Sequence, residues 1–171
     1  MKRFVLFLGF LAMFANIFAF RFMGVDIEGN VETVADNLAA KGFVRKVGTV
    51  QTGPDKGKKE VMKTEDTLFL EGKYEGNDAI LLLRFPKKDD VVTELYLSIE
   101  KASISEILEA WRKVSNGLVE KYGIPDIDAD VRDFPDSNSK FIKQWEFKDV
   151  TICLDMPKNG YEILFSISPN D

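Results

Sequence analysis

Alternation of apolar and polar residues is the feature that most constrains the fold of this chain. In the segments 91–100, 149–156 and 160–168, apolar residues recur at nearly every second position. The residues expected on one common face are Thr93, Leu95, Leu97, Ile99, Val150, Ile152, Leu154, Met156, Tyr161, Ile163, Phe165 and Ile167. Because successive side chains of a strand point to opposite faces, the pattern predicts antiparallel strands with one buried face and one wet face.

Two segments have helical spacing and can cover the apolar face of these strands. The first, 30–41, begins at a possible cap, Asn30, and ends before Gly42, and the second, 103–122, begins with the capping box Ser103-Ile-Ser-Glu106. Their apolar positions are Val31, Val34, Ala35 and Leu38 in the first segment, and Ile104, Ile107, Leu108, Trp111, Val114, Leu118 and Tyr122 in the second. We predict an α+β fold, in which an antiparallel sheet has both helices packed on one face.

The remaining periodic segments predict further strands and an internal repeat. These strands cover 44–50, 59–64, 67–75, 78–86 and 141–148, with turns at 51–58, at Gly76-Asn77 and at 157–160. The segments 78–87 and 149–158 resemble each other, since each has an apolar strand before Pro-Lys. Two helix-plus-meander units, 30–100 and 103–168, are therefore expected, and chance similarity between amphipathic strands is the alternative.

The start of the chain predicts export. Lys2 and Arg3 precede an apolar run from Phe4 to Phe20, which is the pattern of a secretory signal peptide. We expect cleavage after residue 19, a single domain at 20–171, and a secreted or periplasmic location. The alternative is a retained membrane anchor, although the run is shorter than the ~20 apolar residues that a spanning helix needs.

Composition excludes several classes of function. The chain has a formal net charge of −5, one cysteine and no histidine. The lack of histidine removes Ser-His-Asp and Cys-His catalysis and histidine-bound zinc, and one thiol cannot form a multi-thiolate metal site. We therefore expect no enzyme activity, no catalytic residue, no metal and no cofactor. The acidic balance argues against nucleic acid as a partner and against docking on anionic lipid, so a membrane is expected only if the signal segment is retained.

Two further features are weighed as possible sites. Asp126, Asp128 and Asp130 alternate as at the start of a calcium-binding EF-hand loop, but the motif needs Gly at position 131 and Glu at position 137. The chain has valine and serine there, so we interpret the stretch between Pro125 and Lys140 as a solvated acidic connection, with cation binding as the alternative. Cys153 is expected on the face away from the helices and to be inert, because a neighbouring aspartate raises the pKa of a thiol.

The strand face away from the helices is the candidate binding surface. By alternation it carries Ile80, Leu82, Arg84, Glu94, Tyr96 and Leu164, together with Val92, Ser98 and Glu100. Such a mixture of aromatic, aliphatic and charged residues is typical of a surface that binds another protein or an envelope component. One alternative is a carboxylate-based hydrolase acting on glycans around Glu94 and Glu100, which requires carboxyl groups about 5–9.5 Å apart. The other is a membrane-retained structural protein of the envelope.

Most of the chain after the signal peptide carries a family resemblance, and its opening segment is the specific part. Phe22-Met-Gly-Val-Asp-Ile-Glu-Gly29 resembles the F-M-G-x-x-x-[D/E]-G opening of small secreted proteins of uncharacterised function from Bacteroides-type bacteria. The segments 69–76 and 120–123 resemble that family's strand-turn segment and second helix end. The resemblance implies no catalytic residue. The order of elements is also similar in outline to the β-lactamase inhibitor protein fold, although no inhibitor motif matches, so any function taken from it is analogy.

Overall fold

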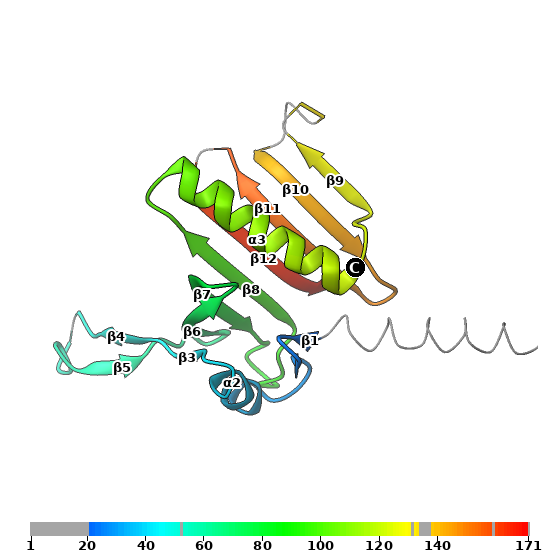
Figure 1. The fold of residues 1–171 in the computed structure, drawn as a ribbon. Helices are drawn as coiled ribbons and strands as arrows, with labels where there is room; N and C mark the ends of the chain where they lie inside the picture. Colours follow the sequence, from blue (N-terminus) through cyan, green and yellow to red (C-terminus); the bar gives the residue numbers. More distant parts are fainter. Residues whose placement is uncertain (1–20, 52, 131, 134–137, 159, 171) are drawn as a thin grey trace, which may run out of the picture.

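The computed structural model describes residues 21–51, 53–130, 132–133, 138–158 and 160–170. The predicted signal peptide, 1–19, lies outside the described residues. The structure confirms the predicted α+β fold. A long helix, residues 104–122, lies across one face of an antiparallel sheet, and a shorter helix, residues 31–39, lies near the end of the sheet that the long helix does not cover (Figure 1).

The described residues include two helices and twelve strands. The helices are α2 (Val31–Ala39) and α3 (Ile104–Tyr122). The strands are β1 (Arg21–Phe22), β2 (Val25–Asp26), β3 (Val44–Arg45), β4 (Val47–Thr49), β5 (Lys59–Val61), β6 (Thr67–Tyr74), β7 (Asn77–Arg84), β8 (Glu94–Glu100), β9 (Ile127–Asp130), β10 (Ser139–Glu146), β11 (Val150–Pro157) and β12 (Glu162–Pro169). Eight of them form the main sheet, while β1 pairs with β2 and β4 pairs with β5.

The order of strands in the main sheet reads as two mirrored halves. It is β3-β6-β7-β8-β12-β11-β10-β9, with antiparallel neighbours throughout. Each half contains a helix followed by four strands of this sheet, and the halves meet where β8 pairs with β12. Strands β7 and β11 occupy the same position in the two halves. They contain most of the similar segments 78–87 and 149–158. This is the element order expected for two helix-plus-meander units.

One apolar core lies between the helices and the sheet. The predicted helix positions Val34, Leu38, Val114 and Leu118 are at most 2% exposed, and they belong to the same buried cluster as Leu97 and the other inward residues of the strands. Alternation within each strand therefore places one face of the sheet against both helices. The polar side chains alternate onto the opposite face, which we call the outer face.

Four predicted positions are wrong, and each lies at or just outside the end of an element. Thr93, Tyr161 and Ile104 were expected in the core but are exposed, because β8 begins at Glu94, β12 begins at Glu162 and Ile104 is the first residue of α3. Val92 was expected on the outer face but is 5% exposed and belongs to the core. Its backbone N–H donates to the carbonyl of Gly29, which holds the segment before β8 against the start of α2.

The helix ends follow the sequence signals. The side chain of Asn30 accepts a hydrogen bond from the N–H of Glu32, and that of Ser103 accepts one from the N–H of Glu106. After α3, Gly123 has a φ of 86°, a left-handed value that glycine adopts without a steric penalty.

The segment that begins at Phe22 has a clear structural role. Met23 and Gly24, with φ values of 52° and 79°, form the two-residue connection between β1 and β2, as expected for a type I′ hairpin. Phe22 is 1% exposed, and its ring lies 5.1 Å from that of Tyr74 and 5.8 Å from that of Phe165. The opening of the domain is therefore fixed to the core by an aromatic side chain.

Two connections differ from expectation. The turn between β6 and β7 is Glu75-Gly76, not Gly76-Asn77, and Asn77 begins β7 with a buried side chain. The segment interpreted as a solvated acidic connection contains β9, an edge strand that pairs with β10. Sequence alternation could not reveal β9, since its apolar positions are only isoleucine and alanine, and pairing with β10 orders it.

Candidate functional site

The outer face of β7, β8 and β12 brings the predicted binding residues together. Leu82 lies directly opposite Tyr96, Arg84 lies opposite Glu94, and both Ile80 and Leu164 lie opposite Ser98. The six predicted residues Ile80, Leu82, Arg84, Glu94, Tyr96 and Leu164 therefore form one contiguous group on three neighbouring strands. Arg84 and Leu164 are exposed and the other four are half-buried.

Glu94 organises the polar part of this group. The hydroxyl of Tyr96 donates to Oε2 of Glu94 over 3.0 Å, and Nη1 of Arg84 donates to the same oxygen over 3.2 Å. Burial, followed by the hydrogen bond to Glu94, raises the pKa of Tyr96, because both favour the protonated hydroxyl that donates to Glu94. The result is a fixed aromatic ring beside a paired guanidinium and carboxylate.

An open hollow adjoins this group at the β3 side of the sheet. It has a volume of about 560 Å³, and Ile80 and Ser98 line both the hollow and the predicted group. Its other lining residues include Val44 and Lys46, which follow α2, and Glu71 of β6. Sequence alternation missed Val44 and Lys46 as part of this surface, because only the pairing of β3 with β6 places them there.

Glu94 and Glu100 do not form a facing pair of carboxylates with each other. Glu94 and Glu100 stand at the two ends of β8, six positions apart, which corresponds to about 20 Å along an extended strand. That separation exceeds the about 9.5 Å that glycoside hydrolysis allows. Glu100 instead lies opposite Glu162, whose Oε1 accepts a hydrogen bond of 2.7 Å from Ser98.

Cys153 lies on the outer face of β11, as predicted, between Gln144 and Ser166 of the neighbouring strands. Burial, with a smaller effect of the nearby Asp155, raises the pKa of its thiol to about 11. The thiolate is the reactive form of cysteine, so this thiol is a poor nucleophile at neutral pH.

The three aspartates of the calcium hypothesis bind separate protein groups. Asp126 accepts a hydrogen bond from the N–H of Glu146, Asp128 pairs with Lys143, and Asp130 pairs with Arg132. Positions 131 and 137, which decided that hypothesis in the sequence, lie outside the described residues. Among the described residues, no group of three or more His, Cys, Asp or Glu side chains is arranged to hold a metal ion.

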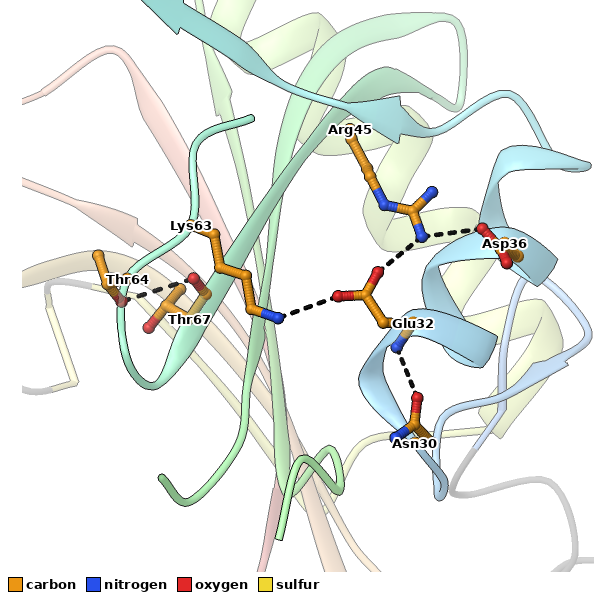
Figure 2. Close-up of polar contacts among 7 residues, drawn as sticks. All are labelled: Asn30, Glu32, Asp36, Arg45, Lys63, Thr64 and Thr67. Carbon is orange, nitrogen blue, oxygen red and sulfur yellow. Dashed lines mark hydrogen bonds and ion pairs between the residues drawn. The ribbon is translucent and has the colours of Figure 1, made fainter. Parts of the chain in front are cut away.

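A polar network fastens the region after α2 to that helix. Figure 2 shows Glu32 of α2 between two cations: Nη2 of Arg45 lies 2.8 Å from its Oε2 and Nζ of Lys63 lies 2.9 Å from its Oε1. Arg45 also pairs with Asp36 over 2.8 Å. Hydrogen bonds from Arg45 and then Lys63 lower the pKa of Glu32, because both cations favour its charged carboxylate.

The fold and the outer face define an α+β protein built of two helix-and-strand halves, with a wet sheet face that holds an aromatic and charged group. No family model, no curated protein and no solved structure matches this chain. The resemblance of the segment from Phe22 to Gly29 to small secreted proteins stays a prediction, and we take no residue role from it. Within the described ranges, neither helix is long and apolar enough to cross a membrane.

Proposed function

We propose that this chain is a secreted or periplasmic binding module without enzymatic activity, and that the outer face of β7, β8 and β12 contacts another protein or an envelope component. The observation that carries the proposal is the contiguous group around Tyr96. A tyrosine ring and an arginine, the residue types enriched at binding hot spots, lie beside half-buried aliphatic side chains.

The geometry of this group supports binding more than catalysis. Tyr96 and Arg84 share Glu94 as an acceptor, so their polar groups are already oriented on rigid strands before a partner arrives. Such preorganisation lowers the entropic cost of association. The pair Glu94 and Glu100 cannot support the hydrolase alternative, since the two residues lie at opposite ends of β8.

The proposed secreted or periplasmic location rests on the predicted signal peptide, residues 1–19. Lys2 and Arg3, followed by a short apolar run, support export and cleavage. N-terminal sequencing of the protein from its native cells tests this: a start near residue 20 agrees with the proposal. A start at residue 1 or 2 contradicts it and favours the retained anchor.

The binding surface is tested by capture from envelope extract with matched variants. We expect the double variant Leu82→Asp/Tyr96→Asp to lose what the wild-type chain captures, because two charges would disrupt the aromatic and aliphatic contact. Ile124→Asp is the control, since Ile124 is 89% exposed and lies outside the group. It introduces the same kind of charge and should leave capture unchanged.

A folding check accompanies this comparison. If circular dichroism shows that the double variant is unfolded, the single variant Leu164→Asp replaces it, because Leu164 is 39% exposed and its change leaves the core intact. Capture that is the same for the wild-type chain and for a folded outer-face variant would reject the surface.

A further inference from the structure

A basic ribbon, which we define as residues 44–63, differs from the rest of the chain in charge. It contains six lysine or arginine residues and two acidic residues, a net charge of +4, whereas the whole chain carries −5, which leaves −9 for the remainder. The net charge of the whole chain therefore hides a positive region beside a negative one, and the positive region can attract an anionic partner. Strands β4 and β5 of the ribbon extend away from the part of the sheet that α3 covers (Figure 1).

The ribbon also concentrates exposed apolar side chains. Four of the nine large hydrophobic residues that are exposed among the described residues lie in it: Val44, Val47, Val61 and Met62. Val47 and Val61 are direct cross-strand neighbours of β4 and β5. The ribbon thus combines aliphatic side chains with positive charge over a short stretch of chain.

The rest of the domain leaves residues 56–63 of this ribbon uncovered. Every residue from 56 to 65 is exposed, and β4 and β5 form a sheet of only two strands. A two-stranded hairpin is only marginally stable in water by itself. Contacts at its base, where Arg45 and Lys63 bind Glu32, hold it to α2 and leave its outer part free for a ligand.

Several cations of the ribbon are available for binding. Arg45 pairs with both Glu32 and Asp36, Lys63 pairs with Glu32, and Lys58 pairs with Asp55. Within the described part of the chain, no ion pair involves the other three ribbon lysines, Lys46, Lys56 and Lys59. Of these three lysines, Lys56 and Lys59 are exposed, whereas Lys46 is half-buried and lines the hollow beside the outer face.

We propose that the ribbon is a docking site for an anionic lipid surface. Lysines are attracted to acidic headgroups, and the exposed valines and methionine can enter the boundary between headgroups and acyl chains. The negative body favours an approach with the ribbon first. Single-stranded nucleic acid fits less well, because such sites stack bases on aromatic side chains and residues 44–63 contain no Phe, Tyr or Trp. This proposal uses a different surface from the outer face and does not depend on it.

The test measures sedimentation of the full chain with vesicles of phosphatidylcholine alone or with about 30 mol% phosphatidylglycerol. We expect the wild-type chain to bind the anionic vesicles more strongly. Lys56→Gln/Lys59→Gln should lower the partition coefficient of the chain onto anionic vesicles about 10- to 30-fold, since each lysine contributes roughly a three- to fivefold factor. The control Lys88→Gln/Lys148→Gln removes two exposed lysines of the body that lie outside residues 44–63, and it should leave binding unchanged.

A second pair of variants tests the apolar contribution. Val47→Ser/Val61→Ser should weaken binding to anionic vesicles, whereas Ile104→Ser, at an exposed aliphatic of α3, should not. Because residues 4–20 are the same in every variant, differences between variants report on the ribbon. Equal binding to both vesicle types, or no effect of the Lys56 and Lys59 changes, overturns the proposal. Binding to a single-stranded oligonucleotide without binding to anionic vesicles also overturns it and assigns the ribbon to nucleic acid.

Discussion

At the scale of single residues, the environment of each polar group decides whether it can act chemically. Cys153 has the residue type of a nucleophile, but burial beside Asp155 raises the pKa of its thiol. Glu94 has the residue type of a catalytic acid, but it is occupied by Tyr96 and Arg84. Both side chains are therefore held in contacts with other groups of the sheet.

We predict that Cys153 reacts slowly with a thiol reagent at neutral pH and that its rate increases up to a pH of about 11. Unfolding in urea should restore a pKa near the ordinary value of 9.0. Because the folded pKa is raised, the stability that the neutral thiol contributes is complete below pH 9.0 and is lost as the pH rises toward about 11. The rate against pH, measured with and without urea, checks this; the same pH profile in both would contradict it.

At the scale of elements, local sequence signals define α3 more completely than any other part of the fold. Ser103 caps its first turn, Gly123 ends it, and its apolar stripe faces the sheet. Strand β9 shows the opposite case, since its four residues have a weak pattern and are ordered by pairing with β10. Elements with their own caps and stripes could be predicted, whereas an element that depends on its neighbour could not.

We predict that Ser103→Ala lowers the free energy of unfolding by about 1 kcal/mol, because the N–H of Glu106 loses its acceptor. Ser103→Asp is the matched variant, since an aspartate at the same position can cap the helix. Urea unfolding of both variants measures the difference. Equal loss of stability in both would show that the cap does not stabilise α3.

At the scale of the whole molecule, one core joins both halves of the sheet. Alternation predicted which strand residues enter this core, and it was wrong only next to element ends, as at Val92 and Tyr161. The candidate outer-face group was predictable for the same reason, since its residues alternate with core residues. The hollow beside it and the uncovered ribbon were not, because they depend on how β3, β4 and β5 are placed by tertiary contacts.

Replacing Phe22 measures how much the contact of β1 with this common core contributes to the stability of the fold. We predict that Phe22→Ala lowers the free energy of unfolding by about 3–5 kcal/mol, since it leaves a cavity among Phe43, Tyr74 and Phe165. Ile104→Ala, at an exposed position, is the control and should change stability by no more than about 0.5 kcal/mol. Thermal or urea unfolding checks both values, and similar losses in the two variants would contradict the role of Phe22.

The mirrored strand order has a consequence for how the chain can be divided. The last strand of each half, β8 or β12, forms its outer hydrogen bonds with the last strand of the other half. The backbone crosses from the first half to the second in the connection from β8 to α3. We expect that a break in that connection would leave two fragments whose exposed edges, β8 and β12, can pair again without a covalent link. By the same geometry, two copies of the chain that exchange one half would recreate every strand pair of the sheet.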